Sequence, residues 1–386
     1  MSERPATLQQ LFDWLVDGAP GAATPMAVVE HLGTELRASG VPVERIGAFV
    51  RTLHPHIVGR GFFWMPGAPT RVVENAWAGL NSEGFKRSVP AKVEQTGLEV
   101  RARLDAGQTG YTGLDDLQAQ GFTDYLMLPL KFMGGTVHSI GFATKTPSGF
   151  TDAHLEALRF VGRPLARVSE TLALMRTAVN LLNTYVGRDA GERILAGRIQ
   201  RGDTEAIRAV IWFSDLRGFT SMSGERTPAQ IIAVLNQVFD CQVPHIEQHG
   251  GEVLKFMGDG MLAIFPIVGD DVADAASRAS KAGTAAFASL DALNLTRPSE
   301  APLRFGVALH VGEVAYGNIG GASRLDFTAI GPAVNLASRI EGLTGKLDKR
   351  LLLSEAVAAA ATFATRLVGR FELKGVAGEC PVYETS

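Results

Sequence analysis

The sequence has few cysteines, no long apolar segment and no large excess of charge. Its 386 residues include only Cys241 and Cys380, which excludes a disulfide scaffold and favours a reducing compartment. No apolar run approaches the roughly 20 residues that cross a bilayer. Residues 1–20 carry Asp13 and Asp17 among their apolar positions and lack the continuous apolar stretch of a signal peptide. We therefore expect a cytoplasmic protein with no membrane span.

The charge balance limits the classes of partner. Lysine and arginine number 37 and the acidic residues 40, so the chain lacks the basic excess of a general nucleic-acid or membrane-surface binder. Small molecules are the expected partners. The length predicts two or three domains, each large enough to bury a core.

Apolar patterning divides the chain into a first mixed region, a helical region and a second mixed region, over residues 1–150, 151–204 and 205–386. In the first region, runs such as Ile57–Met65 and Tyr125–Phe132 have the spacing of strands, whereas Ala27–Ala38 and Pro90–Leu104 have that of helices. Strands of hairpin spacing mixed with helices predict an α+β module.

The helical region carries an apolar seam whose spacing alternates between three and four residues. Its members are Leu158, Val161, Leu165, Val168, Leu172, Met175, Val179 and Leu182. This spacing predicts a coiled coil between two chains. Alternatively, the helix packs on its own N-terminal domain, because Pro164 interrupts the first heptads.

Two carboxylates follow strand-like runs in the second mixed region. Val210–Phe213 reads as a buried strand that delivers Asp215 just before a glycine turn and a helix, a pattern suited to phosphate and metal. Glu252–Met257 and Met261–Phe265 read as the arms of a hairpin with Asp259 in its tight turn. The sequence therefore places two metal-capable aspartates at two strand tips.

A third block, Phe327–Arg339, supplies a hydroxyl, an amide and a guanidinium. Asn335 and Arg339 are four residues apart and share one helix face. Together with the two aspartate motifs, this block makes roughly residues 205–385 resemble the class III nucleotidyl cyclases, which convert a nucleoside triphosphate into a 3′,5′-cyclic monophosphate and pyrophosphate. The resemblance implies an α/β fold of the ferredoxin-like, polymerase-palm type.

The resemblance implies a two-metal site. Asp215 and Asp259 would hold two Mg²⁺ ions, which Mn²⁺ can replace, and Leu216 is assigned to the same site. The phosphate contacts implied by the resemblance come from Gly218, Phe219, Thr220 and Lys374. Asn335 and Arg339 would orient the ribose and stabilise charge on the transferring phosphate. Alternatively, Asp215 only caps a helix and Asp259 only occupies a turn.

Base recognition is assigned by the same resemblance to Lys255 and Thr328, a pairing that implies ATP. The lysine can donate to ring nitrogens of adenine and the threonine hydroxyl can accept from its amino group. Relatives often have Asp in place of Thr328, so GTP or a pyrimidine triphosphate is the alternative substrate.

One copy of each motif implies a homodimer, because in the family each site takes its metal-binding and transition-state residues from different subunits. Residues 1–150 resemble a GAF or PAS-type domain, which implies regulation and a small-molecule ligand. The rival hypotheses are a non-catalytic nucleotide sensor, which would have lost one of the site residues, and a phosphohydrolase, which needs no base pocket.

Overall fold

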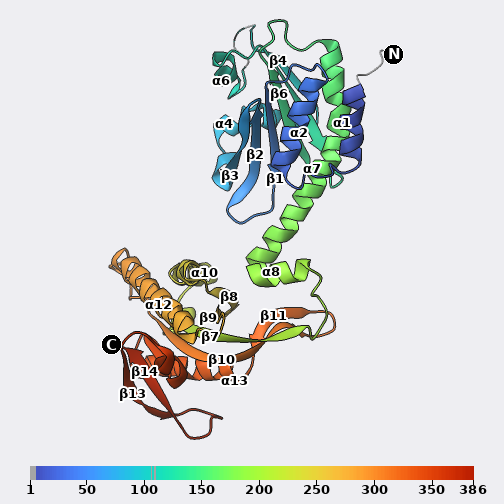
Figure 1. The fold of residues 1–386 in the computed structure, drawn as a ribbon. Helices are drawn as coiled ribbons and strands as arrows, with labels where there is room; N and C mark the ends of the chain where they lie inside the picture. The colour runs from blue at the N-terminus through green and yellow to red at the C-terminus, as the bar shows by residue number, and fades with distance from the viewer. Residues whose placement is uncertain (1–5, 106, 108–109) are drawn as a thin grey trace. The chain divides into compact units, whose positions relative to one another are not determined.

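The computed structural model describes residues 6–105, 107 and 110–386. The chain forms two compact units that divide between Leu181 and Leu182 (Figure 1). Among the described residues, no helix is both long and apolar enough to cross a membrane.

The first unit is built on a six-stranded sheet in which all neighbouring strands are antiparallel, in the order β3-β2-β1-β6-β5-β4. Its elements are α1 (Ala6–Val16), α2 (Pro25–Ala38), β1 (Arg45–Arg51), β2 (Ile57–Met65), β3 (Ala68–Ala76), α3 (Trp77–Leu80), α4 (Glu83–Lys86), α5 (Val89–Thr96), β4 (Val100–Arg103), α6 (Leu114–Ala119), β5 (Asp124–Lys131), β6 (Val137–Thr144) and α7 (Asp152–Val186). Helices α1, α2 and the first part of α7 share one apolar core with the sheet.

The expected helix over Pro90–Leu104 is wrong in its second half. Helix α5 ends at Thr96 because Gly97 adopts a left-handed conformation (φ 63°) and its N–H bonds the Val93 carbonyl. The chain then forms the edge strand β4, which pairs with β5. The α+β character expected for this region is confirmed.

The seam of α7 divides into two parts. Leu158, Val161, Leu165 and Val168 are buried in the core of the first unit, as the packing alternative predicted. Farther along the helix, Met175 is 63% exposed. A coiled coil therefore stays a prediction only for the part of the seam beyond the core.

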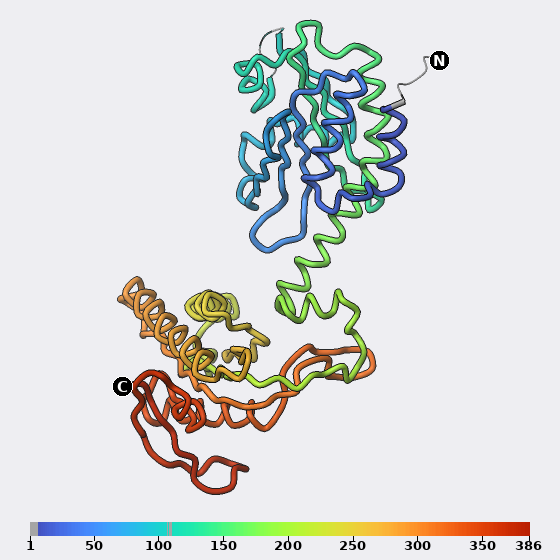
Figure 2. The backbone as a smooth tube through the Cα atoms, in the orientation of Figure 1, coloured from blue at the N-terminus to red at the C-terminus, as the bar shows by residue number. Residues whose placement is uncertain are grey.

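The second unit is built on an eight-stranded sheet in the order β13-β14-β12-β10-β7-β9-β8, with β11 paired to β10. Its elements are α8 (Arg188–Leu195), β7 (Thr204–Leu216), α9 (Phe219–Glu225), α10 (Pro228–Asp240), α11 (Val243–Gln248), β8 (Glu252–Met257), β9 (Gly260–Pro266), α12 (Val272–Leu295), β10 (Phe305–Gly320), β11 (Leu325–Ile330), α13 (Pro332–Lys346), β12 (Leu351–Ser354), α14 (Glu355–Ala360), β13 (Thr365–Glu372) and β14 (Glu379–Thr385). Figure 2 shows β7 running beside β10 and the long β10–β11 extension.

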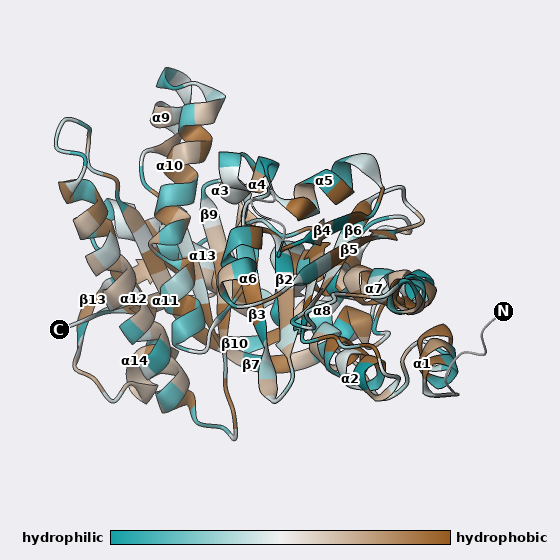
Figure 3. Cartoon of the chain, turned by 90° about the horizontal axis from the view of Figure 1, so that it is seen from above, coloured by the Kyte–Doolittle hydropathy of each residue, from teal (hydrophilic) through white to brown (hydrophobic). Residues whose placement is uncertain are grey.

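The centre of this sheet has the predicted ferredoxin-like topology. Strands β10-β7-β9-β8 are adjacent in that order, with helices between β7 and β8 and again between β9 and β10. Alternate residues of β7 enter different cores: Val210 and Trp212 pack with α12, whereas Ala209 and Ile211 pack with α13. Figure 3 shows brown apolar and teal polar residues alternating along α10, as a helix with one buried side requires. Asp215 continues the odd-numbered series of β7 and lies on the α13 side.

Candidate active site

Two carboxylates meet at one end of the central strands. Asp215 is the penultimate residue of β7 and pairs in register with Gly260, the first residue of β9. Asp259 immediately precedes Gly260 in the two-residue β8–β9 turn, where Gly258 has φ 67°. A glycine at the first turn position accepts this left-handed conformation without strain. The predicted hairpin and the predicted position of both aspartates are confirmed.

Gly260 allows the two acids to approach each other. A Cβ atom at this position would lie 2.9 Å from the Ser214 carbonyl oxygen and 3.0 Å from Asp215 Oδ1. Any side chain here would therefore displace the carboxylate or separate β7 from β9. Gly260 therefore helps to position Asp215. The sequence shows the glycine, but only the structure shows why a side chain does not fit there.

The electrostatics of the pair fit a cation site. Burial, followed by the neighbouring charge of Asp259 and a hydrogen bond with it, raises the pKa of Asp215 to about 6. The Leu216 N–H counteracts this by donating to the Asp215 carboxylate, and the apolar Leu216 side chain is buried. Leu216 can thus offer a metal only its backbone.

The donor set suits a cation that keeps part of its coordination for a ligand. Across the described residues, no group of three or more His, Cys, Asp or Glu side chains is arranged to hold a metal. Two carboxylates and a backbone group leave the remaining positions to water and phosphate oxygens, as Mg²⁺ sites commonly do. The residues present therefore fit Mg²⁺ held jointly with a phosphorylated substrate.

A third acid, Glu341 on α13, was missed by sequence reasoning. It is buried, and burial together with the charge of Asp215 raises its pKa to about 7. Its carboxylate accepts a hydrogen bond from the Thr344 hydroxyl at 3.1 Å. Its position in the sequence could have revealed it, because an acid beside Ala337 and Ile340 lies on the apolar face of α13.

The turn after β7 has the predicted backbone, but the side chains that follow it lie in different environments. Gly218 is left-handed (φ 73°) and precedes the short helix α9. The Phe219 side chain packs against the core, so only the backbone of this residue could contact a phosphate. Thr220 is exposed. The structure brings these three residues to the same strand end as Asp215.

Lys255 comes from β8, which pairs with β9, and Thr328 comes from β11, which pairs with β10. A bulge between Val253 and Lys255 shifts the register of β8 against β9, which turns side chains relative to a regular strand. The Lys255 ammonium group pairs with the Asp326 carboxylate on β11. Asp326 lies two residues before Thr328 and hence on the same strand face. Sequence reasoning missed Asp326, although strand alternation placed it beside a proposed base contact.

Asn335, Arg339 and Lys374 belong to a separate part of the unit. Helix α13 starts at Pro332, whose missing N–H costs nothing at the first helical position, so the proline has a structural role. Asn335 is exposed and Arg339 half-buried. A Cβ atom at Gly375 would lie 3.1 Å from a guanidinium nitrogen of Arg339, so the loop carrying Lys374 covers this arginine.

One helix separates the acidic and basic groups within a chain. Glu341 points into the core on the Asp215 side, while Arg339 is two positions earlier, roughly 200° away around the helix. Arg339 therefore does not face the carboxylate pair of its own chain.

Comparison with known proteins identifies the second unit. Residues 203–384 match the family described as the adenylate and guanylate cyclase catalytic domain. These residues, nearly half of the chain, are therefore similar to the catalytic domains of adenylate and guanylate cyclases. The matched residues account for almost all of the second mixed region.

Two curated relatives and one solved structure illustrate the similarity. An adenylate cyclase from Anabaena cylindrica is 30% identical over 58% of this chain and 48% of its own length. The terminal-differentiation-specific adenylate cyclase of Dictyostelium discoideum is 34% identical over 47% of this chain and 9% of its own. The guanylyl cyclase Cya2 has 29% identity and a TM-score of 0.41, covering 47% of this chain and 93% of that one. The chain thus spans less than half the length of either curated relative.

Proposed function

We propose that the protein is an adenylate cyclase that converts ATP into 3′,5′-cyclic AMP and pyrophosphate in the cytoplasm. The carrying observation is the close pair of Asp215 and Asp259, whose like charges lie beside each other at the strand end where Gly218 opens a turn. Adenylate cyclases among the relatives support this assignment.

The carboxylates of Asp215 and Asp259 and the backbone of Leu216 would hold two divalent cations, Mg²⁺ or Mn²⁺. When bound, these cations lower the pKa of the ribose 3′-hydroxyl and neutralise the triphosphate. The residues that would hold the cations come from the end of β7 and from the β8–β9 turn. Backbone N–H groups of Gly218, Phe219 and Thr220 would face the phosphate oxygens.

Attack requires the 3′-oxygen to approach the α-phosphorus in line with the departing pyrophosphate. Lys255 and Thr328 would hold adenine, with Asp326 keeping the lysine on the β11 side. Asn335 would orient the ribose, Arg339 would donate to the transferring phosphate, and Lys374 would contact the terminal phosphates.

A composite site follows from the separation of these groups. Arg339 lies on the face of α13 opposite Glu341 and away from Asp215, so a single chain does not unite acid and guanidinium. A homodimer in which each site takes its aspartates from one chain and Asn335 and Arg339 from the other solves this problem. The first unit would regulate the dimer through α7.

The direct test is to incubate the purified full chain with Mg²⁺ or Mn²⁺ and each of the four nucleoside triphosphates. We expect cyclic AMP and pyrophosphate from ATP, identified by mass. A cyclic product from GTP alone would overturn the base assignment, and nucleotide binding without turnover would make the protein a sensor.

Shared sites have their own test. Asp215→Asn and Arg339→Ala chains should each be inactive, and mixing them should restore up to about a quarter of wild-type activity in statistical exchange, since one of two sites in half of the dimers is intact. Heterodimers isolated with two different tags and still inactive would contradict a composite site.

A further inference from the structure

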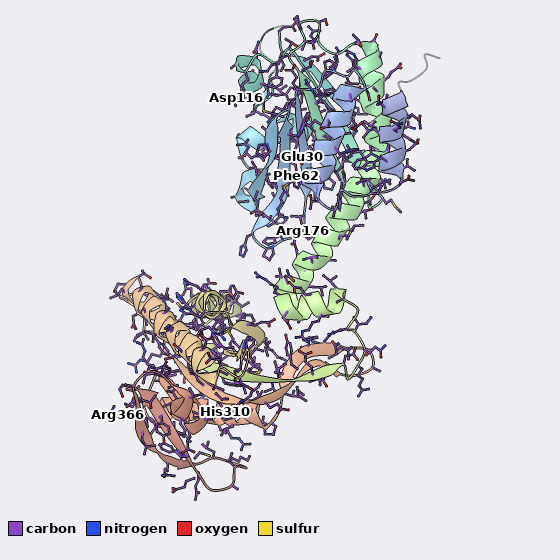
Figure 4. The ribbon with its side chains drawn as sticks, in the orientation of Figure 1. Glu30, Phe62, Asp116, Arg176, His310 and Arg366 are labelled. Atoms are coloured by element: carbon purple, nitrogen blue, oxygen red, sulfur yellow. The ribbon has the colours of Figure 1, made fainter. Side chains whose placement is uncertain are left out.

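The first unit contains an apolar cavity of about 450 Å³ between its sheet and the helices α2 and α7. Its floor is formed by small and apolar residues of the sheet, including Ala48, Phe62 and Ile140, and its walls by Val29 of α2 and Leu172 of α7. Figure 4 shows Phe62 on the sheet and Arg176 on α7. The volume lies within the roughly 300–1,000 Å³ of small-molecule sites.

The cavity results from uneven helix packing. Helix α2 touches the sheet at Gly33, where a Cβ atom would lie 2.5 Å from the Trp64 ring. Helix α7 touches the sheet at Gly162, where a Cβ atom would lie 3.2 Å from the Leu128 side chain. Neither glycine lines the cavity. The helices are therefore held tightly at these points and leave space beyond them.

Charge at the cavity is predominantly positive. Three arginines line it, together with one acid, Glu74. Glu74 is occupied by Arg60, which donates to it from Nε and Nη2 at 2.9 and 2.8 Å, and Arg51 pairs with Glu94 outside the lining. Arg176 is exposed on α7 and has no carboxylate partner among the residues that the structure describes.

We propose that this cavity binds a single-chain amphiphile with an anionic head group, such as a medium- or long-chain carboxylate. The chain would fill the apolar space and the head group would pair with the guanidinium of Arg176. Because Leu172, Met175 and Val179 form one wall, occupancy would alter the packing of α7, the helix that leads into the cyclase unit. The inference is independent of the reaction assigned to that unit.

The probe is dodecanoate, titrated into the delipidated full chain by calorimetry, with dodecan-1-ol as the uncharged analogue. We expect saturable binding of one dodecanoate per chain. Arg176→Ala should weaken dodecanoate about tenfold, the loss of one charged hydrogen bond, and leave dodecanol unchanged. The matched control is Arg163→Ala, which removes an exposed guanidinium of the same helix that does not line the cavity.

A second variant tests the position of the acyl chain. Ala48→Phe should fill the floor and weaken both ligands at least tenfold, with circular dichroism establishing that the variant is folded. No binding to the wild-type chain, equal losses in the Arg176 and Arg163 variants, or unchanged binding in folded Ala48→Phe would each overturn the proposal. A dimer formed through the exposed part of α7 would be dissociated by Met175→Glu. Dodecanoate binding that appears only in this variant would also overturn the proposal, because a second copy of the chain would then occupy the cavity in the wild-type protein.

Discussion

Asp124 in the first unit is a buried sheet carboxylate and Asp215 in the second a half-buried one, and their charged neighbours have opposite signs. Asp124 is 0% exposed, and its Oδ2 accepts from Arg101 Nη2 at 2.7 Å and from the Phe150 N–H at 2.9 Å. The charged neighbour of Asp215 is another acid, Asp259. Burial alone therefore does not distinguish a structural from a functional acid, whereas the charge of the neighbour does.

The largest effect is expected at the functional acid. Asp215→Asn should lower cyclase turnover by at least about a hundredfold, because it removes a negative charge that holds the cations. The folded state should keep or gain stability, since repulsion with Asp259 disappears. Cyclic AMP production and thermal unfolding of the same preparation measure both quantities.

Mg²⁺ provides the control for this variant. Saturating Mg²⁺ with a non-hydrolysable ATP analogue should raise the unfolding temperature of the wild-type chain and raise it less in Asp215→Asn. If the variant retained full turnover, the two-carboxylate site would be refuted. If it lost turnover together with its fold, Asp215 would be structural, like Asp124.

The structural acid should give the opposite result. Asp124→Asn should destabilise the first unit by about 2 kcal/mol, because the buried Asp124 loses its charged hydrogen bonds with Arg101, whose own side chain is 34% exposed. Urea unfolding measures the loss, and Asp116→Asn, at an exposed acid of α6, should change stability by less than about 0.5 kcal/mol. Equal stability in both variants would show that the Arg101 pair contributes nothing.

The same comparison explains what could be predicted from the sequence. Asp215 and Asp259 follow from local rules, since a buried strand and a two-residue glycine turn each fix the position of one acid. The roles of Asp326 and Glu341 depend on contacts with Lys255 and Asp215, which are distant in sequence. Strand β4 was missed because helix and strand propensities compete over four residues and its pairing with β5 decides.

A third prediction concerns pH and the first unit. His138 is buried, and burial followed by the charge of Arg51 lowers its pKa to about 4, while Glu170 acts in the opposite direction. Its Nδ1 accepts from the Arg51 backbone N–H at 3.2 Å, which requires an unprotonated nitrogen. Between pH 6.5 and 4 the unfolded chain binds the extra proton, so stability falls as pH falls through this window and levels off below it.

His138→Asn should remove about 3 kcal/mol of this pH-dependent loss at pH 4, since an amide oxygen can accept the same N–H without titrating. Unfolding free energies at pH 7, 5.5 and 4 give the slope for variant and wild type. His56→Asn, at an exposed histidine, should leave the slope unchanged. Identical slopes for His138→Asn and the wild-type chain would mean that His138 has the same pKa in the folded and unfolded states.

The smallest effect separates two ion pairs that each have an exposed carboxylate, Lys255–Asp326 in the second unit and Arg60–Glu74 in the first. Exposed pairs contribute less than about 1 kcal/mol to stability, so Asp326→Asn and Glu74→Gln should unfold nearly as the wild-type chain does. Only Asp326→Asn should raise the KM for ATP, by up to about tenfold with little change in kcat, because an unanchored Lys255 loses rotamer freedom on binding the base.

Steady-state kinetics with ATP and GTP measure both constants, and selectivity for ATP should fall in parallel. A larger effect on kcat than on KM would place Asp326 in the chemical step, and an equal effect of Glu74→Gln would assign both pairs to general stability.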